Sequence, residues 1–127
     1  MAKYEKKLEE DIRCPLEHGL TIFGGKWKSR IICVLNANEK LRYSAIRKEM
    51  VNITDAVLAA TLKELIEEGI VNRKSYDEIP PHVEYSLTEK GKSVVPILQS
   101  ICEWSGIFYK EDNDHTLTQC QKCDHRR

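Results

Sequence analysis

The sequence from Thr54 to Gly69, TDAVLAATLKELIEEG, decides the fold. Its leucines recur at helical spacing and would form one apolar stripe against a core. The leucines of this stripe are Leu58, Leu62 and Leu65. Thr54 is a good N-cap residue, Asp55 suits the positive end of the helix dipole, and Gly69 suits the position after a helix C-terminus. The stretch therefore predicts a helix over 54–68.

The face of this helix opposite the leucine stripe would present small and charged side chains to solvent. Its residues are Ala56, Ala60, Lys63 and Glu67. A shorter helix is predicted just upstream, over Tyr43–Met50, because Ile46 and Met50 would share one buried face. When two short helices are joined by a tight turn, the second helix can protrude from the domain and enter the DNA major groove. The exposed face over 54–63 is thus a candidate for reading base edges.

Downstream of Gly69 the apolar pattern changes from a helical to an alternating period. Val71–Tyr76 and Val83–Leu87 are predicted strands, joined by the residues between them. Pro80 and Pro81 exclude ladder hydrogen bonds in that connection, which predicts a hairpin with a stiff loop. In a helix-turn-helix domain a hairpin in this place is a wing.

The flanking segments complete one predicted domain in a chain of 127 residues. Further predicted elements are a helix over 16–23, a helix over 26–36, a short strand at 41–42 and a long helix over 88–108. The predicted fold is α+β but mostly α: a winged helix-turn-helix with a two-stranded wing and N- and C-terminal dimerisation helices. An N-terminal helix or arm over 1–13 and a polar, mobile tail over 111–127 would flank the domain, which covers 14–110.

The net charge and the distribution of charged residues indicate what kind of partner this domain binds. The net charge is zero, from 20 basic and 20 acidic residues, which by itself counts against nucleic-acid binding. The distribution favours it, because basic residues gather in or beside the predicted helix pair and wing. They are Lys26, Lys28, Arg30, Arg42, Arg47, Lys48, Lys63, Arg73 and Lys74. A small amphipathic domain with one hairpin is also compatible with a protein-interaction module, so the pattern alone leaves both functions open.

Several motifs, in order and at matching spacing, resemble one family. They are CPLE at 14–17, FGGKWK at 23–28, LIEEGIV at 65–71 and PPHVEYSLTEKG at 80–91. Together they resemble the HxlR-type regulators, which are related to the MarR-like winged-helix proteins, and the likeness spans residues 12–108. The resemblance implies a dimeric transcription factor that binds double-stranded operator DNA and often responds to oxidative or electrophile stress. It places the reading helix over 53–65 and the wing loop over 79–82.

Pattern and resemblance together predict which residues contact DNA. They are Lys26, Lys28, Arg42, Tyr43, Ser44, Thr54, Asp55, Ala56, Ala59, Ala60, Lys63, Arg73, Lys74 and His82. The chain departs from the family pattern at Ala56, Ala59 and Ala60, where polar residues are common, and at His82, where arginine is common. Alanine can touch thymine methyl groups but cannot bond guanine bidentately. We therefore expect a reader that relies on shape, apolar contacts and backbone anchoring.

The five cysteines do not form a disulfide framework, since their number is odd and their spacing uneven. Cys14 precedes a predicted helix start and follows Arg13, an environment that favours thiolate, and the resemblance implies that it is a redox sensor. Cys33 and Cys102 lie on apolar helices and are expected to be packing residues. Cys120 and Cys123, with nearby histidines, are the best metal candidate, but one cysteine pair on a polar tail is a weak zinc signal. No metal or other cofactor is therefore predicted, and a disulfide between this pair stays open.

The long C-terminal helix has more apolar surface than one small winged domain can cover. The predicted dimer interface is Val94, Ile97, Leu98, Ile101, Trp104 and Phe108. A two-fold dimer would set two reading helices one helical turn apart, on an inverted repeat. The predicted function is a homodimeric repressor that responds to thiol or electrophile stress or to a small molecule. The alternative is an interaction module that does not bind DNA specifically.

The remaining signals are mostly negative. No nucleophile motif, paired carboxylates or glycine-rich phosphate loop is present, so no catalytic residue and no enzyme is predicted. The N-terminus lacks the apolar stretch of a signal peptide, and no apolar run could span a bilayer. A cytoplasmic protein without a membrane partner is therefore expected.

Overall fold

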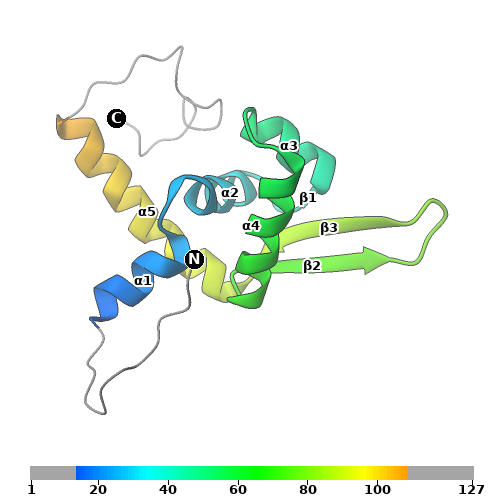
Figure 1. The fold of residues 1–127 in the computed structure, drawn as a ribbon, viewed down its shortest axis with the longest axis horizontal. Helices are drawn as coiled ribbons and strands as arrows, with labels where there is room; N and C mark the ends of the chain where they lie inside the picture. Colours follow the sequence, from blue (N-terminus) through cyan, green and yellow to red (C-terminus); the bar gives the residue numbers. More distant parts are fainter. Residues whose placement is uncertain (1–13, 109–127) are drawn as a thin grey trace.

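The computed structural model of the protein describes residues 14–108, with side chains through residue 106 (Figure 1). The elements, in chain order, are α1 (Pro15–Phe23), α2 (Lys26–Ala37), β1 (Leu41–Arg42), α3 (Tyr43–Met50), α4 (Asp55–Glu67), β2 (Val71–Tyr76), β3 (His82–Leu87) and α5 (Glu89–Phe108). The predicted arm over 1–13 and tail over 111–127, with Cys120 and Cys123, lie outside these residues. Within 14–108 the predicted α+β winged helix-turn-helix is confirmed.

The core is built around α2. Ile31, Ile32, Val34 and Leu35 of this helix are all buried, because they cover more than one side of it and neighbouring elements pack on each. Helices α3, α4 and α5 and strand β3 contact α2. The leucine stripe of α4 closes one side of this core, as the leucine spacing predicted.

The ends of α4 explain why the helix stops where the sequence indicates. The Thr54 hydroxyl accepts a hydrogen bond from the Val57 amide at 3.2 Å, which caps the first turn. At the other end Gly69 adopts a φ of 76°, a conformation that a Cβ would oppose. The amides of Gly69 and Ile70 then donate to the carbonyls of Ile66 and Leu65, the Schellman pattern. The chain leaves the helix directly into β2.

The wing is an antiparallel hairpin that extends away from the helices (Figure 1). Its register pairs Val71 with Leu87 at the base and Tyr76 with His82 near the tip. Strand β1 adds to the outer side of β3, so the sheet order is β1-β3-β2. The sequence predicted β1 but not its partner, and this pairing anchors the wing to the start of α3.

Among the described residues, no helix combines the length and the apolar character that crossing a bilayer requires.

Candidate nucleic-acid interface

The exposed side of α4 is the centre of the site. Ala56, Ala59, Ala60 and Lys63 are all exposed, while the leucines behind them are buried. This burial pattern is what the helical spacing predicted. Alanine side chains are short, so this part of the helix surface is low and the backbone of α4 can approach another molecule closely. Lys63 adds one cation beside this low surface.

The N-terminus of α4 is fixed to α3 by two polar contacts. The Tyr43 hydroxyl donates to the main-chain carbonyl of Asp55 at 3.1 Å. Arg47 Nε lies 2.6 Å from Asp55 Oδ1, and both side chains remain at least half exposed. Burial first and the Asp55 carboxylate second raise the pKa of Tyr43. These contacts hold α3 and α4 in one fixed arrangement.

Arg47, one of the basic residues that gather at the predicted helix pair, belongs to the site. It lies in the last turn of α3, four residues after Tyr43, and its guanidinium is held beside the start of the reading helix. Asp55, by contrast, was predicted to contact DNA, yet its carboxylate pairs with this arginine. In the sequence, the i, i+4 spacing of Tyr43 and Arg47 indicates that both side chains lie on one face of α3.

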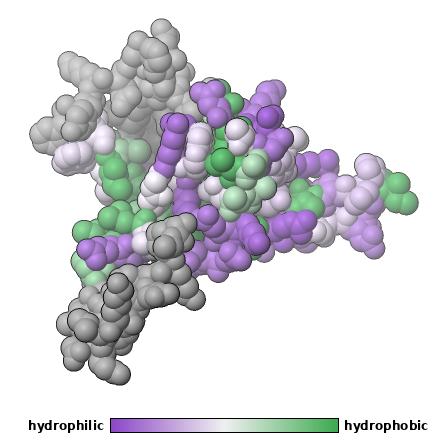
Figure 2. All heavy atoms as spheres, in the orientation of Figure 1, coloured by the Kyte–Doolittle hydropathy of each residue, from purple (hydrophilic) through white to green (hydrophobic). Residues whose placement is uncertain are grey.

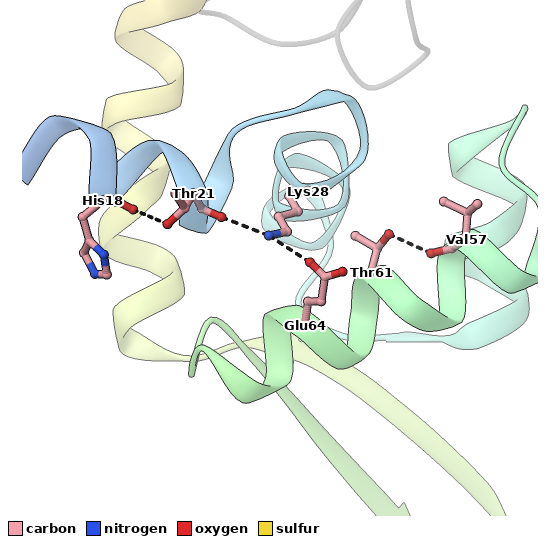
Figure 3. Close-up of polar contacts among 6 residues, drawn as sticks. All are labelled: His18, Thr21, Lys28, Val57, Thr61 and Glu64. Carbon is pink, nitrogen blue, oxygen red and sulfur yellow. Dashed lines mark hydrogen bonds and ion pairs between the residues drawn. The ribbon is translucent and has the colours of Figure 1, made fainter. Parts of the chain in front are cut away.

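Lys28, a predicted DNA contact, is bonded within the protein. Its ammonium lies 3.0 Å from Glu64 Oε2 of α4 and donates to the carbonyl of Thr21 in α1 at 3.0 Å, as Figure 3 shows. The side chain is only 20% exposed. Both acceptors belong to the protein itself, so the Lys28 ammonium forms an interhelical contact in this structure.

Other predicted basic residues are presented to solvent. Lys26 is exposed, and its Nζ lies 4.6 Å from the centre of the Trp27 ring. Arg42 and Ser44, at the junction of β1 and α3, are exposed as well. On the wing, Arg73 donates to the Ser75 hydroxyl at 3.2 Å.

Lys74 lies beside Arg73 on β2, with its Nζ 5.0 Å from the Tyr76 ring. It is exposed, like Arg73. Exposed cations are thus placed at the start of α3 and on the wing.

His82, another predicted DNA contact, also has partners within the protein. Its ring stacks on Tyr76 at 4.4 Å between centroids, and its nitrogens lie 3.8 Å from Glu78 and 3.6 Å from Glu84. Its side chain is only 14% exposed. A hydrogen bond from Tyr76, with lesser effects from Lys40 and His82, lowers the pKa of Glu84. His82 therefore packs within the hairpin.

The described cysteines differ in how exposed their thiols are. Cys14 is exposed at the N-cap position of α1, and Cys33 packs against the core as expected. Cys102, also expected to be a packing residue, is exposed on α5 in the single protomer. No group of three His, Cys, Asp or Glu within the described part of the chain is arranged to hold a metal ion.

The predicted dimer surface is also revised. Val94 and Leu98 are buried in the protomer's own core, because this side of α5 faces α2. Ile97, Ile101 and Trp104 are about half exposed, and the side chain of Phe108 lies outside the described ones. Helix α1 adds exposed leucines to the apolar surface. These are Leu16 at 68% and Leu20 at 47%. Figure 2 shows hydrophobic surface over α1 and the adjoining part of α5.

Comparison with known proteins agrees with this architecture. The HxlR-like helix-turn-helix family matches residues 22–113. An HTH-type transcriptional regulator of Methanothermobacter thermautotrophicus is 46% identical over 100 residues, which are 79% of this chain and 76% of that protein. The redox regulator HypR in its oxidised form superposes with a TM-score of 0.70 at 38% identity, covering 78% of this chain and 99% of HypR. The reduced form of the transcriptional regulator YodB from Bacillus subtilis gives 0.70 at 33% identity, covering 80% and 100%.

These matches agree with the motifs, the fold and the exposed helix. The family consists of DNA-binding regulators and not of enzymes, in keeping with a site that presents cations and a low helical surface. The chain belongs to the HxlR-like helix-turn-helix family of transcriptional regulators.

Proposed function

We propose that the protein is a homodimeric repressor that binds an inverted repeat and releases it under thiol or electrophile stress, or on binding a small molecule. The observation that carries the proposal is the exposed alanine surface of α4, together with exposed cations at the start of α3 and on the wing. Such a surface fits the major groove, about 12 Å wide, without large side chains holding the backbone away.

Binding would divide between phosphate and base contacts. Arg42, Arg73 and Lys74, with Lys26, contact phosphates and set the register of the protein on the duplex. The alanines of α4 contact thymine methyl groups, and Lys63 contacts either a base edge or a phosphate. Arg47, oriented by Asp55, adds a phosphate contact at the start of the reading helix. Affinity would therefore come mainly from the backbone and selectivity from groove shape.

The response to stress is proposed for Cys14. This thiol is exposed and immediately precedes α1, which carries part of the apolar surface described above. HypR is a redox regulator, and YodB has been solved both reduced and after diamide treatment. Modification of Cys14 would shift α1 against α5 and so change the spacing of the two reading helices.

DNA binding is tested by fluorescence anisotropy with duplex from upstream of the protein's own gene. Lys63→Ala and Arg42→Ala are each expected to weaken binding and to lower the salt slope by about 0.9 for a lost phosphate contact. Lys92→Ala is the matched control, because this exposed lysine lies in the first turn of α5, near the end of α2, and not on α3, α4 or the wing. Unchanged binding in both test variants would contradict the assigned face. Salt-insensitive binding, together with a captured protein partner, would favour the interaction module instead.

The thiol response is tested separately with diamide. Wild-type protein is expected to lose affinity for the duplex on treatment and to recover it with dithiothreitol, because the modification is a reversible thiol oxidation. Cys14→Ser should bind DNA normally and keep its affinity after treatment. Equal loss in both proteins would remove Cys14 from the mechanism, while DNA binding itself would stand.

A further inference from the structure

The contact between Lys28 and its two acceptors joins the consecutive helices α1 and α2 to α4, which lies further along the chain. Lys28 lies in the first turn of α2, Thr21 in the last turn of α1, and Glu64 on the exposed side of α4. Figure 3 shows the lysine between the two acceptors, with α1 on one side and α4 on the other. Helices α1 and α4 each pack against α2. The ammonium thus bonds the reading helix and α1 at the same time.

The acceptor in α1 is a carbonyl that needs an external donor. The last four carbonyls of a helix have no amide partner within it, and α1 ends at Phe23. A cation at a helix C-terminus is also favoured by the dipole. The Thr21 hydroxyl donates to the carbonyl of His18 at 2.6 Å, and the main-chain carbonyl of Thr21 accepts from Lys28. The position of the ammonium therefore depends on where α1 ends.

The acceptor in α4 is a carboxylate next to the reading surface. Glu64 is 55% exposed and directly follows Lys63. Because its oxygen and the Thr21 carbonyl are bonded by the same ammonium, displacement of α1 must lengthen one bond or move α4. Lys28 itself is four-fifths covered, which shields this contact from solvent more than an ordinary surface pair.

We propose that Lys28 is a positioning residue that couples α1 to the reading helix, so that a change in α1 alters DNA binding and DNA binding stabilises α1. The inference rests on the proposed DNA-binding function of α4 and extends it to regulation. It does not depend on what displaces α1. Coupling between two sites is reciprocal, so it is measurable from either side.

The experiment uses the full chain and follows amide hydrogen exchange with and without the operator duplex. In the wild type, DNA should slow exchange in α4 and also in α1, the latter by about two- to fivefold, the range of one partly exposed ion pair. Lys28→Met removes the ammonium and Glu64→Gln removes the charged acceptor. Each should keep the protection of α4 and lose that of α1, and the double variant should behave like either single one.

Lys63→Met is the matched control, since it removes a lysine from the same exposed side of α4 but not from the bridge. It should weaken DNA binding and lower the salt slope, yet keep the protection of α1 at saturating DNA. Lys28→Met should leave the salt slope unchanged, because Lys28 contacts no phosphate.

The possible results separate the coupling role of Lys28 from the proposed DNA-binding function. Protection of α1 that is equal in wild type, Lys28→Met and Glu64→Gln would overturn the coupling role and leave DNA binding intact. A wild type that binds DNA without protecting α1 would do the same. A salt slope that falls by about one in Lys28→Met would return this lysine to the phosphate contacts. Absence of duplex binding by the wild type would overturn the proposed function and the coupling with it.

Discussion

Gly91 is a residue where the backbone leaves no room for a side chain. It lies in the first turn of α5, and its amide donates to the Thr88 hydroxyl at 3.0 Å. A Cβ on Gly91 would overlap the carbonyl oxygen of Ile70 and lie 3.2 Å from Leu87 Cδ2. The end of α4, the base of the wing and the start of α5 therefore meet at this point.

We expect Gly91→Ala to lower the free energy of unfolding by about 1–3 kcal/mol, the usual cost of forcing extra atoms into a packed site. Gly19→Ala is the control, because a Cβ there would make only an ordinary contact, 3.8 Å from the Phe23 ring. In the interior of α1, alanine should be neutral or stabilising by up to about 1 kcal/mol. Urea unfolding of the three proteins measures both effects, and equal midpoints for Gly91→Ala and wild type would contradict the close approach.

The wing is an element with its own cluster of charges. Tyr76 and His82 stack across the strand pair, and Glu84 lies between His82 and Lys40. The hydrogen bond from Tyr76, together with these neighbours, lowers the pKa of Glu84 from its ordinary value of 4.5. In the unfolded chain those contacts are absent, so the folded protein favours the ionised form more strongly.

The sign of the pH effect follows from this shift. A carboxyl whose pKa is lower in the folded state stabilises the protein above its unfolded pKa of 4.5. That stability is lost as the pH falls through the folded pKa. We therefore expect the difference in urea midpoint between wild type and Glu84→Gln to shrink on acidification from about pH 7 to pH 3. Glu67→Gln, on the exposed side of α4 away from this cluster, is the control. A difference that stays constant over this range would contradict the role of Glu84.

Helices and strands followed from the sequence because their signals are local. The leucine spacing, the Thr54 cap and Gly69 each act within a few residues, and the structure confirms all three for α4. Contacts between elements could not be predicted in the same way. The pairing of β1 with β3 and the fixed position of the Lys28 ammonium depend on which segments the fold brings together.

The site shows the same division. Exposure of the α4 alanines follows from helix periodicity, so the reading surface was predictable. The partners of a long charged or aromatic side chain are set by tertiary packing, as with His82 and its place between Tyr76 and Glu84. Composition shows that a residue can contact phosphate, but it does not show whether another part of the chain already binds it.

The apolar surface on α1 and α5 concerns the whole molecule. Ile97 at 49% and Ile101 at 48% exposure, with Trp104 at 55%, are large side chains to leave in water on a protein of this size. Residues next to them on α5 are buried in the protomer, so this surface is what remains for a partner. If the partner is a second copy, two α4 helices are held together and bind a longer DNA site than one can.

A charge in the centre of that surface should separate the two protomers without unfolding either. In Ile101→Glu we expect sedimentation to give the mass of one 14.7 kDa chain at concentrations where the wild type is dimeric. The affinity of two linked half-sites exceeds that of one half-site by a factor of about 10²–10⁴. Affinity for an inverted repeat should therefore decrease by a factor in that range, while affinity for a half-site changes little. Gln99→Glu adds the same charge on another side of α5 and should leave both measurements as in the wild type. A monomeric Ile101→Glu protein that still binds the full repeat with wild-type affinity would show that one reading helix suffices. A dimeric one would place the interface elsewhere on the molecule.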